Sequence, residues 1–133
     1  MITNVTIRYG AISADNCQYC SIDFNEITGN GGAIILSATD YTNITNNNMV
    51  KSYRGIVLDG SSSAVSFVNI IGNNISEGNK AISMNLSGKV LIAKNIIKNC
   101  QLAIEATNCT DKVVVYYNDF IDNNSSSQVH GDW

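Results

Sequence analysis

The chain has 133 residues, of which 44% are hydrophobic and only 14% are charged, and it contains no proline. This composition indicates one folded domain with a core and excludes a disordered linker. The net charge of −3, with eight basic residues scattered along the chain, argues against nucleic acid as a partner.

In chain order, the first segment is an incomplete copy of a repeat over residues 1–14, with Val5, Ile12 and Ala14 at its apolar positions. Regular copies follow over residues 15–120, each anchored on an asparagine in the pattern I-x-x-N-x-I. The anchors, at intervals of 22, 26, 22 and 23 residues, are Asn25, Asn47, Asn73, Asn95 and Asn118. After Phe120 the polar run "DNNSSSQ" replaces the expected apolar strand, so an irregular tail is predicted over residues 121–133.

The apolar positions of the repeat keep a fixed distance from the anchors. An Ile or Val stands three residues before each anchor, and an Ile, Met or Phe stands two residues after it. Nine residues after the first four anchors stand Ile34, Ile56, Ile82 and Ile104. Each unit therefore holds three short β-like pieces and no stretch long enough for an amphipathic helix.

A repeat of about 22 residues built from such pieces predicts a solenoid. One unit cannot bury its apolar side alone, but units stacked about 4.8 Å apart can. We predict an all-β fold, a single-stranded right-handed parallel β-helix of about six coils that forms one domain over residues 1–133. The anchor asparagines are expected at sharp bends, because asparagine tolerates left-handed backbone angles, and their amides are expected to form a hydrogen-bonded ladder along the rod.

The chain resembles right-handed β-helices of the pectin-lyase-like superfamily in two features. These are the repeated element N-x-I-x(6)-[AG]-I-x-[LM] and the ending "VYYNDFIDNNSSSQVHGDW". Within this superfamily, they resemble the asparagine-rich repeats of NosD-like and archaeal adhesin-like surface proteins. The resemblance covers nearly the whole chain. It implies the fold but not one function, because the same coils serve lyases, hydrolases, epimerases and passive stalks.

Active sites in that superfamily lie on the outer face of the strand that here reads A-I-x-L. The resemblance therefore directs attention to Asp59 and Glu105, which are expected two coils apart, roughly 10 Å. An inverting hydrolase needs two such separated carboxyls. The candidate substrate-binding residues near them are Arg54, Lys80, Tyr53 and Asn85. Arg54 and Lys80 are expected in one column, where they could meet a sugar carboxylate, and Tyr53 could supply a stacking ring.

Other features of the same face argue against catalysis. Ile35 and Val57 occupy its middle, and the paired-Asp and Gly-His-Gly signatures of the hydrolases are missing. The sequence therefore leans toward a protein that is not an enzyme. A polysaccharide-active lyase, hydrolase or epimerase is the alternative.

The sequence offers no convergent set of metal ligands, and neither a metal nor another cofactor is predicted. His130 is the only histidine, whereas copper and zinc sites need several His or Cys ligands. Cys17 and Cys20 are the only plausible local disulfide, and Cys20 is expected to point inward. Cys100 and Cys109 lie on either side of one strand and are expected to be free thiols.

Seven N-x-S/T sites fit an extracellular or cell-surface protein: Asn4, Asn43, Asn74, Asn85, Asn108, Asn123 and Asn124. Most such sites arise from composition in a chain this rich in Asn, Ser and Thr. The start "MITNVTIRYG" alternates like a strand and shows no signal peptide, and no apolar run is long enough to span a membrane.

The strand before each anchor changes character along the chain. Its outward positions are polar in the early copies but apolar in the later ones, at Ile71, Leu91, Val114 and Tyr116. An exposed apolar patch of this kind marks an interface, unless the segment 125–133 folds over it. We expect a structural stalk, an adhesion module or a carbohydrate-associating module that packs against another copy or a neighbouring domain. A glycan is a further candidate partner.

Overall fold

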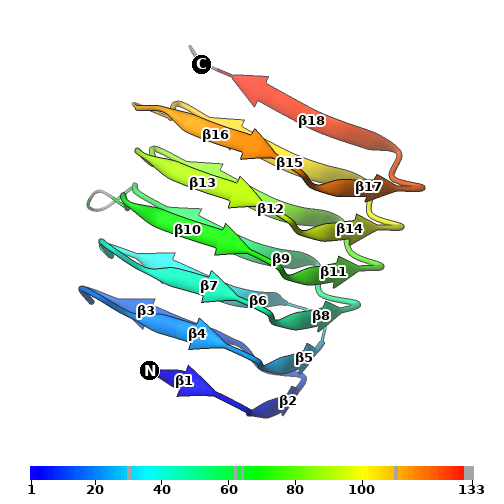
Figure 1. Cartoon of the computed structure of the whole chain (residues 1–133), viewed down its shortest axis with the longest axis horizontal. Coiled ribbons are helices and arrows are strands. Elements are labelled where there is room, and N and C mark those ends of the chain that lie inside the picture. Colours follow the sequence, from blue (N-terminus) through cyan, green and yellow to red (C-terminus); the bar gives the residue numbers. More distant parts are fainter. Residues whose placement is uncertain (30, 62, 64, 110, 131–133) are drawn as a thin grey trace.

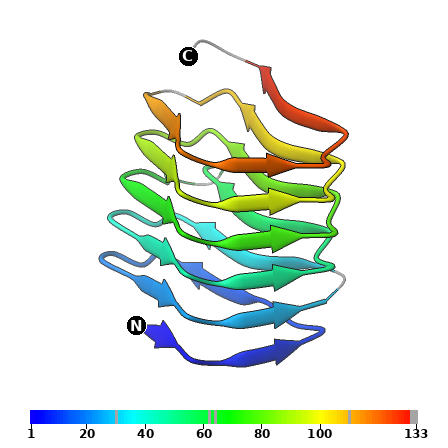
Figure 2. The ribbon, with the colours of Figure 1, turned by 45° about the vertical axis from the view of Figure 1, so that its right-hand side comes forward.

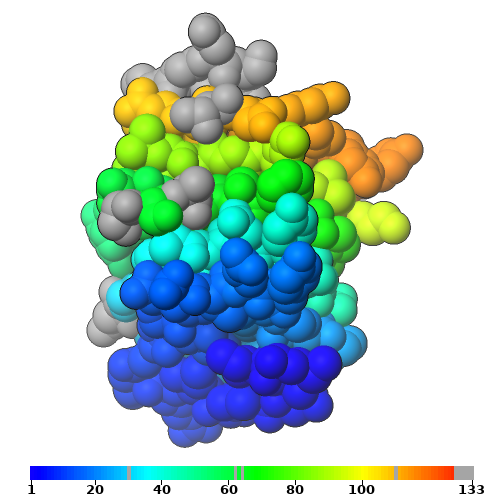
Figure 3. All heavy atoms as spheres, turned by 90° about the vertical axis from the view of Figure 1, so that its left-hand side faces the viewer, coloured from blue at the N-terminus to red at the C-terminus, as the bar shows by residue number. Residues whose placement is uncertain are grey.

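The computed structural model describes residues 1–29, 31–61, 63, 65–109 and 111–130. For residues 128–130 it describes only the backbone. The described residues form a β-solenoid of six coils without helices, which confirms the fold predicted from the repeat (Figure 1). Each coil contributes three strands that follow one another around the axis (Figure 2). The coils follow sequence order along the rod, as the colour bands of the space-filling view show (Figure 3).

The strands form three parallel sheets, each with six strands. Sheet A contains β1 (Ile2–Thr3), β4 (Ser21–Asp23), β7 (Asn43–Thr45), β10 (Val68–Ile71), β13 (Val90–Ala93) and β16 (Val113–Tyr116). Sheet B contains β2 (Thr6–Arg8), β5 (Glu26–Thr28), β8 (Asn48–Val50), β11 (Asn74–Ser76), β14 (Ile96–Lys98) and β17 (Asp119–Ile121). Sheet C contains β3 (Ile12–Asp15), β6 (Gly32–Ser37), β9 (Arg54–Asp59), β12 (Lys80–Asn85), β15 (Leu102–Thr107) and β18 (Ser125–His130).

The core is a set of in-register apolar columns that run along the axis. In sheet C, for example, Ile34, Ile56 and Ile82 are paired in successive strands, and each is fully buried. Each such isoleucine contributes about 1.5–3 kcal/mol relative to an exposed side chain. One coil could not bury this surface by itself, so stacking is what stabilises the fold.

The five anchor asparagines form the predicted ladder between sheets A and B. The amide of Asn47 donates to Oδ1 of Asn73 at 3.0 Å and to the carbonyl of Ile22 at 2.9 Å. The same contacts recur from Asn25 to Asn118. Asn25, Asn47, Asn73 and Asn95 are at most 2% exposed, so the ladder bonds among these four are made inside the rod.

The prediction that these asparagines themselves adopt left-handed backbone angles is wrong. The residue before each anchor has the positive φ, as in Asn46 (54°), Gly72 (70°) and Lys94 (56°). The bend is therefore made one residue earlier, which leaves the anchor free to turn its amide into the rod. Positive φ also occurs at Tyr, Phe and Lys positions of the other turns, which the sequence did not indicate.

The two ends of the repeat are more regular than the sequence predicts. The first coil, expected to be incomplete, has all three strands, and Val5 replaces asparagine in the ladder column by donating its N–H to Asn25. Within the tail predicted to be irregular, β18 pairs in register with β15, with Leu102 opposite Ser125 and Ile104 opposite Ser127. Backbone pairing therefore continues where the apolar side chains of the repeat end.

Candidate functional site

The structure places the predicted catalytic and substrate-binding residues on the outer face of sheet C. Arg54 and Lys80 are paired in one column, and Asp59 is paired with Asn85 in another. Glu105 is paired with Ser83, so it lies two coils and two strand positions from Asp59. From strand spacings this corresponds to about 12 Å between the two Cα atoms.

Glu105 is tied into a local network rather than presented to a ligand. Its carboxylate accepts hydrogen bonds from Lys80 Nζ at 2.6 Å and from the Ser83 hydroxyl at 2.9 Å. Both members of the ion pair are largely buried, with 25% and 18% of their side chains exposed. Lys80 is therefore occupied by Glu105, which weakens the prediction that it holds a substrate carboxylate.

Both candidate carboxyls are held in their ionised form. Burial raises the pKa of Glu105, but the hydrogen bonds from Lys80 and Ser83, with the charges of Lys80 and Arg54, outweigh it and lower the pKa. Hydrogen bonds from the side chain and backbone of Ser61, with the charge of Arg54, lower the pKa of Asp59. A glycosidase acid needs a raised pKa, so neither carboxyl is suited to donate a proton near neutral pH.

The outward apolar residues of the later coils lie together on sheet A, and we call them the apolar half of sheet A: Ile71, Leu91, Val114 and Tyr116. The first three are half-buried and Tyr116 is 42% exposed. The corresponding residues of the earlier coils are polar, for example Ser21 and Asn43. Because β18 pairs with β15 on sheet C, residues 125–130 do not cover this patch as the alternative interpretation required.

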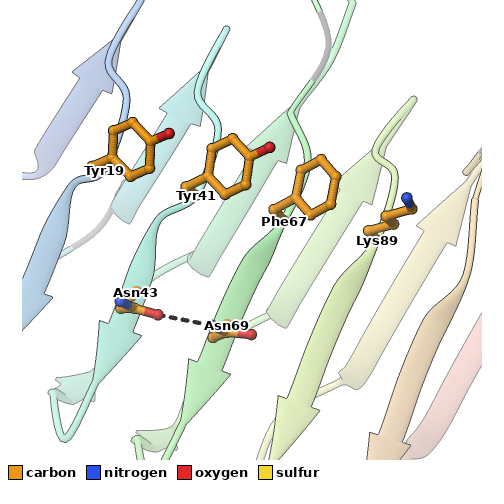
Figure 4. A pocket seen from close by; sticks show the side chains of 6 residues that line it. All are labelled: Tyr19, Tyr41, Asn43, Phe67, Asn69 and Lys89. Atoms are coloured by element: carbon orange, nitrogen blue, oxygen red, sulfur yellow. Dashed lines mark hydrogen bonds between the residues drawn. The ribbon is translucent and has the colours of Figure 1, made fainter.

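A feature that sequence reasoning missed is a row of rings beside the polar half of sheet A. Tyr19 stacks on Tyr41 with ring centroids 5.0 Å apart, and Tyr41 stacks on Phe67 at 4.6 Å. Lys89 follows, with Nζ 4.8 Å from the centre of the Phe67 ring (Figure 4). All four residues have positive φ, which turns their side chains outward at the same point of each coil.

The rings form one wall of an open groove that runs along the rod. Asn43 and Asn69 line the other side and are joined by a 2.8 Å hydrogen bond (Figure 4). The groove has a cavity volume of about 420 Å³. We call it the aromatic groove, lined by Tyr19, Tyr41, Asn43, Phe67, Asn69 and Lys89. The repeat frame contained the signal for it, because each ring stands six residues before an anchor, at Asn25, Asn47 or Asn73.

The cysteines do not form a metal site. Cys17 and Cys20 are joined in the disulfide that the sequence allowed, and Cys20 is half-buried. Cys100 and Cys109 are free, and burial raises the pKa of both thiols, which disfavours the thiolate that metals bind. Within the part of the chain that the structure describes, no three His, Cys, Asp or Glu residues converge as metal ligands. The side chain of His130 lies outside the described residues.

A comparison with protein families assigns the chain to a family of β-helix proteins. The family described as "Periplasmic copper-binding protein (NosD)" matches residues 1–132. No curated protein and no solved structure matches the chain significantly. A periplasmic family is consistent with a location outside the cytoplasm, and over the described ranges no helix is long and apolar enough to cross a membrane. The described side chains do not fit copper, which prefers converging imidazole and thiolate ligands. With nearly all of its length matched, the chain belongs to the NosD family of β-helix proteins.

Proposed function

We propose that the chain is a non-catalytic β-helix module that works outside the cytoplasm as a stalk or adhesion element and joins laterally to a second copy of itself. The rod supports this role because its ladder and core repeat from coil to coil with the same contacts. The location is inferred from the family description.

The observation that carries the proposal is the change along sheet A from polar to apolar outward residues. Ser21, Asn43 and Asn69 occupy the same column as Leu91 and Val114. A solvated sheet face is expected to keep polar residues outward along its whole length. A contiguous apolar patch on such a face favours contact with a matching surface, and an identical patch on a second copy supplies one.

The patch also has the shape that such a contact needs. Leu91 and Val114 line a shallow hollow of about 380 Å³, with Lys89 and Lys112 along one side of it. Ala93, between Ile71 and Tyr116 in the neighbouring column, is only 1% exposed. A shallow, partly covered apolar surface with cations along one side can pack closely while those charges stay in water.

The test is the molar mass of the purified chain as a function of concentration. We expect a monomer–dimer equilibrium that Val114→Asp and Tyr116→Asp both shift to the monomer. Ser21→Asp is the matched control, because it adds the same charge to the same column as Val114 but outside the patch. A monomer at every concentration, or equal effects of Ser21→Asp and Val114→Asp, would contradict lateral self-association.

The polysaccharide-active alternative has less support, because Asp59 and Glu105 are both stabilised as carboxylates. It would regain support if the chain turned over an acidic polysaccharide and lost that activity on Asp59→Asn with Glu105→Gln.

A further inference from the structure

We propose that the aromatic groove binds a linear glycan with acidic groups, laid lengthwise along the rod. The groove lies beside sheet A, on another face from Asp59 and Glu105. Its volume of about 420 Å³ is in the range of ligand sites. Its two walls repeat once per coil, so equivalent groups recur about every 4.8 Å along the axis. Such a surface suits a ligand that is itself a repeating chain.

The exposed groups of the groove match the chemistry of sugars. Tyr19, Tyr41 and Phe67 are 75%, 45% and 39% exposed, and two of these rings carry a hydroxyl. The Asn43–Asn69 bond uses one oxygen and one NH₂ group, so the NH₂ of Asn43 and the oxygen of Asn69 have no side-chain partner among the described residues. Hydroxyls, amides and apolar ring edges together suit a ligand that has both hydroxyl groups and C–H faces.

The arrangement of the rings disfavours other polymers. Tyr41 is stacked on both sides, so its faces cannot take up a nucleic-acid base, and only the outer face of Tyr19 at the end of the row is open. The strands of sheet A beside the groove are paired on both sides, so an extended peptide finds no free strand edge there.

The charge of the groove favours an acidic ligand. Lys89 is the charged residue that lines it, although the whole chain carries a net charge of −3. The ion pair of Lys89 with Asp111 is long, 3.8 Å, and about half of each side chain is exposed. Such pairs are weak, so a ligand carboxylate or sulfate can compete with Asp111 for the ammonium group. Lys112 lies one coil further along the same side.

The binding test uses two probes of equal length, an oligouronate and a neutral glucan oligosaccharide, measured by calorimetry at low and high salt. We expect binding of the oligouronate that weakens with salt, and weaker binding of the glucan. Tyr41→Ala should reduce the affinity at least tenfold, and Lys89→Gln at least threefold with a smaller salt dependence. Asn69→Asp should reduce it about tenfold without removing a ring, and circular dichroism should show that each variant is folded.

Each variant has a control elsewhere on the rod. Tyr9→Ala removes a tyrosine that is 83% exposed, and Lys51→Gln removes a lysine whose ion pair with Glu77 is also 3.8 Å long. Both should leave the affinity unchanged. The proposal is overturned if neither glycan binds, or if binding survives Asn69→Asp and is lost on Tyr53→Ala. Equal affinity for both glycans, with no effect of Lys89→Gln, would contradict the proposal that the ligand is acidic. Preferential binding of an extended peptide would contradict the proposal that the ligand is a glycan.

Discussion

The ladder asparagines show how one residue type, repeated once per coil, joins successive coils into a column. The side chain of Asn73 takes part in five hydrogen bonds, with backbone groups of Ile44, Ile71 and Asn47 and with the amides of Asn47 and Asn95. It is 1% exposed, so water cannot replace any partner that is lost. No other uncharged side chain of this size both donates and accepts in this geometry.

Replacing Asn73 by alanine should therefore be severe. The change leaves the N–H of Asn47 unpaired inside the rod and removes the side-chain bonds to the carbonyl of Ile44 and the amide of Asn47. At roughly 1–3 kcal/mol for the unpaired group and about 1 kcal/mol for each lost bond, we expect a loss of about 3 kcal/mol in the free energy of unfolding. Urea unfolding followed by circular dichroism measures it. Asn69→Ala is the control, because its amide bond to Asn43 is exposed and should cost about 1 kcal/mol or less. Equal losses of unfolding free energy in the two variants would show that burial does not increase the contribution of the ladder bonds to stability.

The candidate sites were partly predictable at the scale of single residues. The alternation of the strands predicts that Arg54 and Lys80 share a column and that Val114 faces outward, and the structure places them so. The ion pair of Lys80 with Glu105 was not predictable from alternation, because the two residues belong to different columns of sheet C. A long lysine side chain reaches from its own column to the next, and alternation does not describe such diagonal contacts.

At the scale of strands and turns, equivalent positions of the repeat are not equivalent in space. Ala33, Ala81 and Ala103 precede the core isoleucines of sheet C, but Gly55 occupies that position in β9. A Cβ atom at residue 55 would lie 2.5 Å from the carbonyl oxygen of Ala81 and 2.8 Å from a methyl group of Ile75. The next coil thus approaches Gly55 more closely than the repeat pattern suggests.

Gly55→Ala should accordingly destabilise the protein, although it restores the residue of the other coils. Overpacking at a rigid backbone contact costs about 1–3 kcal/mol. Gly31→Ala adds the same methyl group where nothing lies within 4 Å, and it should change the free energy of unfolding by no more than about 0.5 kcal/mol. Thermal unfolding of both variants is the measurement. A Gly55→Ala protein as stable as the unmodified chain would mean that the coils can separate locally without cost.

The turns were the least predictable elements. The sequence indicates where the chain bends, but it places the left-handed residue at the anchor instead of one position earlier. The reason is physical: glycine and asparagine signal positive φ, whereas Tyr19 and Tyr41 adopt it in turns whose N–H groups are held by backbone bonds to the next coil. Since the rings point outward only through this geometry, the aromatic groove could not be recognised from residue propensities.

For the whole molecule, the repeat predicts a modular rod in which each coil contacts only its neighbours. Deleting residues 73–94 removes one coil, with β11, β12 and β13, and joins Gly72 to Asn95. The ladder and all core columns then stay in register, and Arg54 takes the place of Lys80 next to Glu105. We expect a folded β-helix with a lower melting temperature, because one interface between coils is lost.

Circular dichroism and thermal unfolding of this deletion variant provide the measurement. Deleting residues 73–83 instead removes β11 and most of β12, so β13 would follow β10 directly and the later strands could no longer meet partners of their own sheet. That variant should not fold. If both deletions behaved alike, the stability of the rod would not depend on the register of its coils.

The direction of the backbone hydrogen bonds has a mechanical consequence. All three sheets bond from coil to coil, parallel to the axis along which the coils stack (Figure 1). A pulling force applied at the two chain termini therefore opens these bonds one coil at a time instead of shearing a whole sheet at once. Each released coil of 22 residues adds about 75 Å of contour length. Under tension, a rod of this kind would lengthen in small steps and absorb a sudden load before it breaks.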